Sequence, residues 1–237
     1  MNTVLITGAN GGIGMAMVEL FLENNYKVFA HYNIKKDNLE KIQSENLLIF
    51  QANLIDVKET EGLFEKVLQV TETIDVLINN AGVYNPVGTF NNLNTELLDE
   101  ALNINLKAPF ILSKKFILLM KKFNNGRIIN ISSIGVKYGG SPLSMPYTIS
   151  KAALETMTIS IAKEAAKYNI LVNSLRVGVV DTNIHKNSVN KSMNNRINMI
   201  PLKRMAKPME IAEYVLFLSS DKSSFTTGSI ISIAGGE

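Results

Sequence analysis

The sequence predicts a single α/β domain built on a doubly wound parallel β-sheet of about seven strands, with helices on both faces. Two observations predict it. Short apolar runs alternate with amphipathic stretches along the whole chain, and a glycine-rich segment, TGANGGIG (7–14), directly follows the first run. Near-continuous apolar strands are typical of parallel sheets that are buried on both faces.

Seven apolar runs are expected to be strands because each is bounded by Gly, Asn, Asp or Ser. They lie at 3–7, 27–31, 47–51, 75–79, 127–132, 170–175 and 229–233. Between them, helical spacing of apolar residues is seen at 15–22 and 63–70, in two long patterns at 95–123 and 147–168, and at 208–219. Pro208 is tolerated there because it opens its helix. This alternation is that of a Rossmann-type fold.

Composition excludes several classes of protein. The chain has 237 residues, 46% of them hydrophobic and 19% charged, with a formal net charge of only +3 and no cysteine. Disulfides and zinc–thiolate sites are therefore excluded, and no nucleic-acid partner is implied. The sequence shows neither a secretory signal nor a run of the ~20 apolar residues that a membrane span needs. We expect a cytoplasmic protein without a metal site.

We see no linker or repeat, so one domain over 1–237 is expected. The segment at 183–205 breaks the alternation because it is polar, with scattered apolar residues. It follows the sixth strand, at the edge where open α/β sheets bind ligands. We interpret it as a substrate lid, with a plain surface loop as the alternative.

The glycine turn carries Gly8, Gly12 and Gly14 immediately before a helix. Glycine lets the backbone approach a phosphate closely, and the N-terminus of a helix attracts an anion. The position favours a dinucleotide, although the spacing differs from the commonest fingerprint and a tight turn without a ligand remains open. The absence of Gly-Lys-Ser/Thr disfavours a P-loop nucleotidase.

Tyr147 and Lys151 stand four residues apart at the start of an apolar helix, and therefore on one face. An ammonium beside a phenol lowers the pKa of the phenol toward a range that is useful for proton transfer. Such a pair also occurs by chance in many helices.

Four motifs occur in order along the chain. They are Thr7-Gly8-x-x-x-Gly12-x-Gly14, Asn79-Asn80-Ala81-Gly82, Ser133, and Tyr147-x-x-x-Lys151. Together they closely resemble the short-chain dehydrogenase/reductases, and the resemblance covers the whole chain. It implies an NAD(P)(H)-dependent oxidoreductase that interconverts a carbonyl and a secondary alcohol.

The resemblance also implies residue roles. Tyr147 matches the family's general acid/base, Lys151 lowers its pKa and binds the nicotinamide ribose, and Ser133 holds the substrate oxygen. Ser132 is a neighbour that points elsewhere. Asn105 matches the residue that holds a water in a proton relay, although Asn103 is a nearby competitor. The implied cofactor-binding residues are Gly8, Asn10, Gly11, Gly12, Ile13, Gly14, Tyr32, Asn33, Asn53, Leu54, Asn80, Ala81, Gly82, Tyr147, Lys151, Val179 and Thr182.

The sequence departs from the family pattern at two places. Val177-Gly178 stands where Pro-Gly is usual, and Ala234 stands where relatives often have Asp. The first predicts a change in loop stiffness, and the second bears on subunit assembly. His31 and His185 are expected to be structural or on the surface.

We expect NADP(H) to be preferred over NAD(H). An acidic residue after the second strand would repel a 2′-phosphate, but this chain has His31-Tyr32-Asn33 there, followed by Lys35 and Lys36. Against this, Gly11 stands where many NADP-dependent relatives have Arg or Lys. In the alternative, Lys35 and Lys36 only solvate the start of a helix and do not bind the cofactor.

The general likeness is to 3-oxoacyl-carrier-protein reductases. Their basic residues before the fifth and sixth strands are replaced here by Asn124 and Tyr168, although Lys121, Lys122 and Lys167 lie close by. These replacements weaken the assignment of a substrate linked to acyl carrier protein without removing it. We expect a ketoreductase similar to the 3-oxoacyl-carrier-protein reductases, with a sugar, polyol or other small secondary alcohol as the alternative substrate. From another class, a non-catalytic dinucleotide-binding regulator remains open. The resemblance implies that the long helices at 95–123 and 147–168 pair across two-fold interfaces, as they do in relatives, to form a homotetramer or homodimer.

Overall fold

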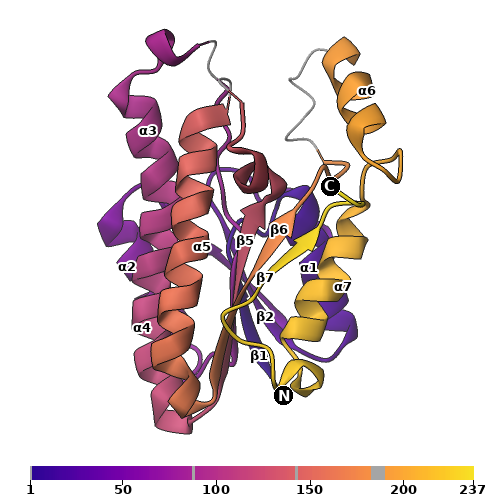
Figure 1. Ribbon diagram of the computed structural model, residues 1–237. Coiled ribbons are helices and arrows are strands. Elements are labelled where there is room, and N and C mark those ends of the chain that lie inside the picture. The colour runs from indigo at the N-terminus through magenta and orange to yellow at the C-terminus, as the bar shows by residue number, and fades with distance from the viewer. Residues whose placement is uncertain (1, 87–88, 142–143, 183–189) are drawn as a thin grey trace.

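The computed structural model of this protein describes residues 2–86, 89–141, 144–182 and 190–237, and shows a parallel sheet between two layers of helices (Figure 1). The strands are β1 (Thr3–Ile6), β2 (Lys27–Tyr32), β3 (Leu47–Gln51), β4 (Val76–Asn79), β5 (Gly126–Ser133), β6 (Ile170–Val177) and β7 (Ile230–Ile233). The helices are α1 (Gly12–Glu23), α2 (Val57–Leu68), α3 (Thr95–Leu102), α4 (Ala108–Phe123), α5 (Met145–Ala165), α6 (Asn190–Met199) and α7 (Pro208–Leu218). The predicted fold class and all seven strands are confirmed.

The strand order is β3-β2-β1-β4-β5-β6-β7, and every neighbouring pair is parallel. The order of the strands reverses between β1 and β4. In open sheets of this kind, ligands bind outside the carboxyl ends of the strands at this reversal. The topology therefore directs attention to the segments that follow β1, β4, β5 and β6.

Two apolar cores hold the layers together. One lies between the sheet and helices α1 and α7, and includes the buried Met17, Phe21 and Val215. The other lies beneath α2, α4 and α5, and includes Leu63, Phe116 and Ala162. Burying a Leu, Val or Phe side chain contributes about 1.5–3 kcal/mol, so both helical layers are firmly anchored. The five central strands are almost wholly buried, as their unbroken apolar runs predict, whereas the edge strands β3 and β7 are partly exposed.

The long helical pattern at 95–123 is not one α-helix. It is divided into α3 and α4 by a π-helical turn, η3, at Asn103–Lys107. The pattern of apolar residues alone does not reveal such a turn, because one extra residue per turn barely changes the spacing. Such π-turns inside helices are frequent at functional sites, and this one contains Asn105.

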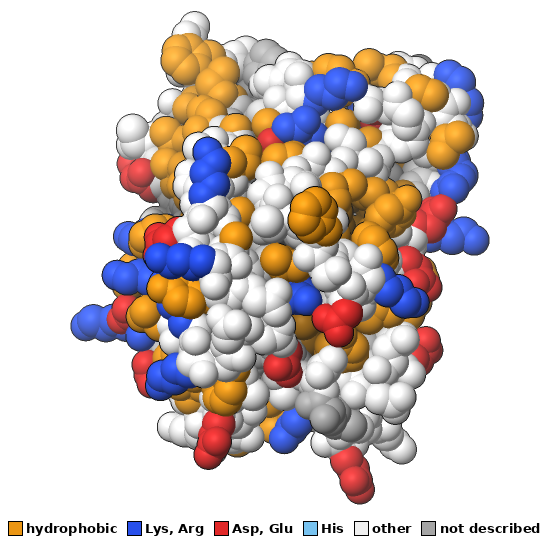
Figure 2. Space-filling model, turned by 60° about the horizontal axis from the view of Figure 1, so that its bottom comes forward, with side chains coloured by type: hydrophobic (Ala, Val, Ile, Leu, Met, Phe, Trp, Pro, Cys, Tyr) orange, Lys and Arg blue, Asp and Glu red, His pale blue; other side chains and the backbone are white. Residues whose placement is uncertain are grey.

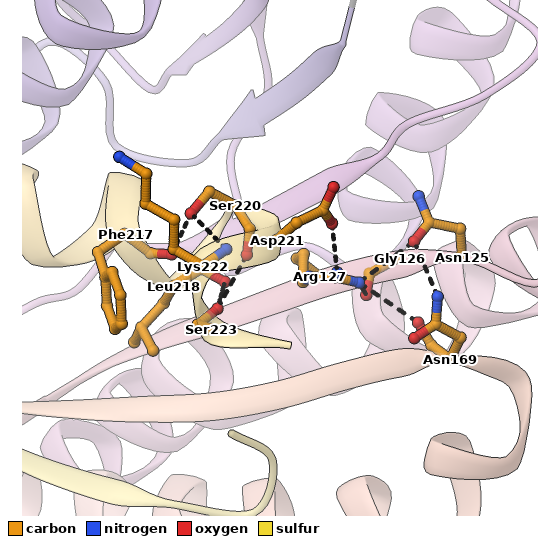
Figure 3. Close-up of polar contacts among 10 residues, drawn as sticks. All are labelled: Asn125, Gly126, Arg127, Asn169, Phe217, Leu218, Ser220, Asp221, Lys222 and Ser223. Atoms are coloured by element: carbon orange, nitrogen blue, oxygen red, sulfur yellow. Dashed lines mark hydrogen bonds and ion pairs between the residues drawn. The ribbon is translucent and has the colours of Figure 1, made fainter. Parts of the chain in front are cut away.

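At the amino ends of the strands, the buried side chain of Arg127 at the start of β5 links several segments of the chain (Figure 3). Its guanidinium donates hydrogen bonds to Asn125 Oδ1 (3.2 Å), to the carbonyl oxygens of Gly126 (3.0 Å) and Asn169 (3.4 Å), and to Asp221 Oδ1 (3.1 Å). These contacts join the starts of β5 and β6 to the short 3₁₀-helix η8 (Asp221–Ser223). The functional residues lie at the opposite edge.

The predicted lid at 183–205 is described only in part, since 183–189 lie outside the described residues. Helix α6 lies beside the carboxyl end of the chain (Figure 1). Arg196 on α6 forms an ion pair with Glu237 (2.5 Å), whose side chain is almost fully buried. The N–H of Leu202 also donates to the carbonyl of Gly235 (3.1 Å). That this segment acts as a lid stays a prediction.

Candidate active site

The turn after β1 is a close-packed glycine cradle. Gly8 has a φ of +65°, which L-residues with side chains rarely adopt, and a Cβ there would lie 2.8 Å from the Cα of Ala81. A Cβ on Gly12 would lie 2.6 Å from Cγ2 of Thr182, and one on Gly14 would overlap the carbonyl oxygen of Gly8. These three positions therefore exclude side chains.

The N-terminus of α1 opens on this cradle. Its N-cap residue, Gly11, has no side chain to accept from the N–H groups of the first turn, so these donors are available to an anion. The neighbouring Ile13 packs against the core between the sheet and α1, so its contribution to a ligand is limited to its backbone. The cradle fits a pyrophosphate, as predicted.

The segment after β4 is tied directly to the cradle. Thr7 Oγ1 accepts hydrogen bonds from the backbone N–H groups of Asn80 and Ala81, both at 3.0 Å. In return, Asn80 Nδ2 donates to the carbonyl oxygens of Thr7 (2.8 Å) and Gly8 (3.1 Å). These bonds fix the ends of β1 and β4 relative to each other at the reversal of strand order. Two separate motifs of the sequence thus form one site.

His31 supports the glycine cradle through a hydrogen bond to Gly8. It is buried at the end of β2; its Nδ1 accepts from the N–H of Gly8 (3.1 Å), and its Nε2 lies 2.9 Å from the carbonyl oxygen of Ala52. Burial lowers the pKa of His31 to about 4, which the Ala52 hydrogen bond partly opposes and the charge of Lys66 assists. The ring is therefore neutral at pH 7, with its proton on Nε2. His31 is structural, as expected, whereas His185 lies outside the described residues.

Asn10 braces the loop after β2. Its Oδ1 accepts from the backbone N–H groups of Asn38 (3.1 Å) and Leu39 (3.3 Å). The cofactor contact that the resemblance implies for Asn10 stays a prediction.

The predicted adenosine side is formed by the ends of β2 and β3. Asn53 Oδ1 accepts from the N–H of Ile55 (3.3 Å), which leaves its amide group to meet a base. Leu54 is buried in the core beneath α2, so only its backbone can face a ligand. Tyr32 ends β2, and the carbonyl of the following Asn33 accepts from Gln51 Nε2 (3.0 Å).

Strand β5 and helix α5 bring the predicted catalytic residues together. The phenol of Tyr147 lies close enough to the hydroxyl of Ser133 for that hydroxyl to lower its pKa. Ser133 Oγ also accepts a hydrogen bond from the N–H of Gly135 (3.2 Å). Lys151 Nζ lies 5.7 Å from the centre of the Tyr147 ring and donates to the carbonyl of Ile131 (2.7 Å). A serine, a tyrosine and a lysine thus meet at the carboxyl end of the sheet.

Between these residues, Ser132 makes a contact that the sequence did not indicate. Its hydroxyl donates to Glu155 Oε1 (2.6 Å), and Glu155 also forms a bidentate ion pair with Arg176 on β6. Ser132 does point away from Ser133, as predicted, but it is tied to the buried carboxylate of Glu155. One feature of the sequence could have placed Glu155 near the site. Tyr147, Lys151 and Glu155 are spaced by four residues and therefore lie along one face of α5.

Asn105 is fully buried in the π-turn and makes three hydrogen bonds. Its Nδ2 donates to the carbonyl of Val83 (3.0 Å) and to Ser150 Oγ (2.9 Å), and its Oδ1 accepts from the N–H of Val83 (2.8 Å). A Cβ on Gly82 would lie 3.3 Å from both Asn105 Oδ1 and Lys151 Nζ. The backbone at Gly82 thus runs directly between these two predicted catalytic groups.

The pKa values of Tyr147 and Lys151 differ from those that their spacing led us to expect. Burial raises the pKa of Tyr147 above its ordinary value of 10; the hydrogen bond from Ser133 opposes this, and the neighbouring Tyr84 adds to it. Burial also lowers the pKa of Lys151 to about 8. The expectation that the lysine lowers the tyrosine pKa is therefore wrong for the protein alone. The physical reason is that Lys151 is desolvated as well, and its ammonium donates to the carbonyl of Ile131 rather than to the phenol.

Tyr84 is a member of the site that the sequence analysis missed. Its ring meets that of Tyr147 edge to face, with centroids 5.4 Å apart and an angle of 89° between the planes. It follows the motif Asn79-Asn80-Ala81-Gly82 by two residues. No spacing rule connects residues 84 and 147, so nothing in the sequence pattern indicated this contact.

The two departures from the family pattern lie side by side. A Cβ on Gly178 would lie 2.8 Å from the Cα of Ala234, and the N–H of Gly178 donates to the carbonyl of Ile233 (2.9 Å). Val179 is buried, and its carbonyl accepts from Ala206 (2.9 Å). The loop after β6 therefore rests on the tail of the chain, where a larger residue than Ala234 would crowd it.

Within the described ranges, no three His, Asp or Glu side chains gather as a metal site requires. Nor does any helix among them have the length and apolar character needed to cross a bilayer.

The comparisons with known proteins agree with this geometry. A family model described as enoyl-(acyl carrier protein) reductase matches residues 8–237. The chain is similar to the 3-oxoacyl-[acyl-carrier-protein] reductase of Thermotoga maritima, with 37% identity over 98% of this chain and 96% of the relative. It is also similar to the 3-oxoacyl-[acyl-carrier-protein] reductase of Rickettsia conorii (37%, 99% and 95%) and to nodulation protein G of a Rhizobium species (32%, 98% and 95%). This chain is an NAD(P)-dependent oxidoreductase and belongs to the short-chain dehydrogenase/reductase family.

Proposed function

We propose that the protein reduces the ketone of a 3-oxoacyl thioester to a secondary alcohol, with NADPH as the preferred cofactor. The observation that carries this proposal is the convergence of the hydroxyls of Ser133 and Tyr147, with Lys151 beside them at the carboxyl edge of the sheet. Two hydroxyl donors at one point suit a single ketone oxygen.

Each residue has a distinct part in the reaction. The bound nicotinamide supplies the hydride. Ser133 donates a hydrogen bond to the substrate oxygen and orients it, and Tyr147 donates its proton to that oxygen as negative charge develops. Lys151 and Asn105 then return a proton from solvent to the tyrosine. The raised pKa of Tyr147 keeps the phenol protonated at neutral pH, as reduction requires.

The same pair of hydroxyls favours a ketone over the carbon–carbon double bond that the description of the family model names. In ketone reduction, the proton goes to an oxygen, which also accepts hydrogen bonds in the ground state. Ser133 and Tyr147 converge as such donors. An enoyl thioester offers them only its thioester oxygen, and the proton that completes its reduction goes to a carbon atom, which accepts no hydrogen bond.

The preference for NADPH rests on the segment after β2. Neither His31, Tyr32 nor Asn33 is acidic, so a 2′-phosphate meets no like charge there. Lys36 is held by Glu40 in an exposed ion pair of 2.6 Å. Such surface pairs are weak, so Lys36 can exchange Glu40 for a phosphate.

A basic cluster around Tyr168 supports an acidic carrier protein as the bearer of the substrate. The Nζ atoms of Lys121 and Lys167 lie 4.7 Å and 5.1 Å from the centre of the Tyr168 ring. The cluster is at the carboxyl end of α5, whereas Tyr147 lies at its amino end. The 21 residues of α5 separate the two by about 30 Å. Within one subunit, this cluster is therefore too far from Tyr147 to serve it directly.

Packing of two subunits through α4 and α5 would bring the Tyr168 cluster closer to a catalytic end than it lies within one subunit. Phe110 and Leu118 on α4 are at least half exposed and line a groove of about 310 Å³ beside α5. Figure 2 shows hydrophobic side chains among lysines and arginines on the left of the molecule, the side on which these helices lie. We propose a homotetramer or homodimer with a two-fold axis here. An antiparallel pairing would bring the Tyr168 cluster of one subunit toward the catalytic end of the other.

The test is the absorbance decay of NADPH, and separately of NADH, with purified protein and acetoacetyl-CoA. Fast decay with NADPH that Tyr147→Phe abolishes is the expected result. Binding of NADPH without turnover on this substrate would contradict the 3-oxoacyl proposal. A panel of sugars and polyols, assayed in both directions, then separates another substrate from a non-catalytic regulator.

A further inference from the structure

We infer that Tyr84 is a positioning residue for Tyr147: its ring holds the catalytic phenol against Ser133. This inference rests on the proposed function of Tyr147. The two rings meet edge to face at 5.4 Å and 89°, a geometry that places the positive edge of one ring on the negative face of the other.

The backbone around Tyr84 is held on both sides. The preceding residue, Val83, is bound through both its N–H (2.8 Å) and its carbonyl (3.0 Å) by the side chain of Asn105. On the other side, Asn85 Nδ2 donates to Glu100 Oε2 of α3 (2.5 Å). Tyr84 is therefore presented to Tyr147 from a braced segment rather than from a free loop.

This arrangement gives Asn105 a second role. Its two hydrogen bonds to Val83 hold the segment that carries Tyr84, and the Tyr147 ring packs against Tyr84. Asn105 also lies near Lys151. The phenol of Tyr147 lies beside Ser133, whose hydroxyl lowers its pKa. The edge-to-face contact with Tyr84 restrains rotation of the Tyr147 ring about its side-chain torsions and so keeps the phenol at that position.

The experiment compares Tyr84→Phe with Tyr84→Leu. Phenylalanine keeps the edge-to-face contact, so kcat is expected to stay within about twofold of the wild type. Leucine loses it, and kcat is expected to fall about two- to twelvefold, the equivalent of an aromatic pair, while the Kd for NADPH is unchanged. Tyr214→Leu on α7, an exposed tyrosine far from the site, is the matched control and should leave kcat unchanged.

A second readout does not depend on turnover. The protein has seven tyrosines, and labelling them with ¹³C at Cζ allows each to be titrated by NMR, with Tyr147→Phe identifying the signal of Tyr147. Tyr84→Phe is expected to move the titration of Tyr147 to lower pH, because the neighbouring phenol helps to raise that pKa.

The inference is overturned if Tyr84→Leu keeps wild-type kcat, or if it weakens cofactor binding and thermal stability as much as turnover. An unchanged Tyr147 titration in Tyr84→Leu, which loses both the ring contact and the neighbouring phenol, would also overturn it. If the wild type turns over no carbonyl substrate, the proposed function fails, while the NMR titration still decides whether Tyr84 controls Tyr147.

Discussion

The hydroxyl of Ser132 donates a hydrogen bond of 2.6 Å to the buried carboxylate of Glu155, in the middle of a row of three contacts. Ile131, Ser132 and Ser133 are consecutive on β5, and they lie against Lys151, Glu155 and Tyr147 in turn. The partners on α5 are spaced by four residues and therefore share one helix face. The predicted catalytic residues are thus held in register by a contact outside the proposed chemistry.

The central contact predicts a strong effect of Glu155→Gln. The side chains of Glu155 and Arg176 are 8% and 22% exposed, so neutralising the acid leaves a largely buried guanidinium without a counter-charge. We expect a loss of about 3–5 kcal/mol in the free energy of unfolding, measured by urea denaturation. The double variant Glu155→Leu, Arg176→Leu removes both charges and is expected to recover most of the loss. Equal destabilisation in the single and double variants would contradict this account.

Lys151→Met is expected to alter the pH dependence of stability. Burial lowers the pKa of Lys151 to about 8, from an ordinary value of 10.5. Between these values the unfolded chain binds a proton that the folded protein does not, so wild-type stability gains about 3 kcal/mol as pH rises through this window. The variant lacks this gain, so the two stability curves, measured by denaturation at pH 8 and 10.5, should converge or cross. Parallel curves would place the lysine pKa near its ordinary value.

Acid should weaken the glycine cradle through His31. Its pKa is lowered to about 4, from an ordinary value of 6.5, so the unfolded chain takes up a proton first as pH falls. Stability should therefore drop by about 3 kcal/mol between pH 6.5 and 4, and NADPH affinity should fall once protonated Nδ1 can no longer accept from Gly8. Denaturation and fluorescence titrations across this range measure both. His31→Gln removes the titrating group and should flatten the stability change.

Subunit assembly is testable at the exposed face of α4. Leu118 is 59% exposed there, so Leu118→Glu should be tolerated in the subunit but place two like charges together at a two-fold axis. We expect multi-angle light scattering to give a smaller particle than for the wild type. Glu213→Leu on α7, away from this face, is the control for a surface change. A wild-type protein that is already monomeric would refute the proposed assembly.

The sequence was sufficient to predict the strands, because a parallel sheet buried on both faces leaves unbroken apolar runs. It also predicted Ser133, Tyr147 and Lys151 as site residues from the order of four motifs along the chain, and the structure brings these three side chains together. The residues that surround these groups were harder to predict from the sequence. Tyr84 meets Tyr147 from another segment of the chain, and the π-turn at Asn105 adds one residue without disturbing the apolar pattern.

The proton affinities could not be obtained from spacing alone. The four-residue interval between Tyr147 and Lys151 indicates that they share a helix face, but it does not say how much water reaches them. Burial raises the first pKa and lowers the second. Likewise, Asn10 carries a side chain suited to a cofactor contact, yet folding directs it to Asn38.

Cofactor preference should respond to Glu40, although no ligand contact is expected from it. Glu40 holds Lys36 at 2.6 Å, next to the loop where a 2′-phosphate would lie. Glu40→Gln keeps the size of the side chain and releases the lysine, so the Kd for NADPH should fall about two- to fivefold, as expected for exposed charges. The Kd for NADH, which lacks the phosphate, should not change, and Lys58→Ala on α2 controls for a general change in charge. Fluorescence titration at low and high salt measures these constants. A gain that is equal for both cofactors would show that Lys36 does not meet the phosphate, because only a contact with that group distinguishes the two dinucleotides.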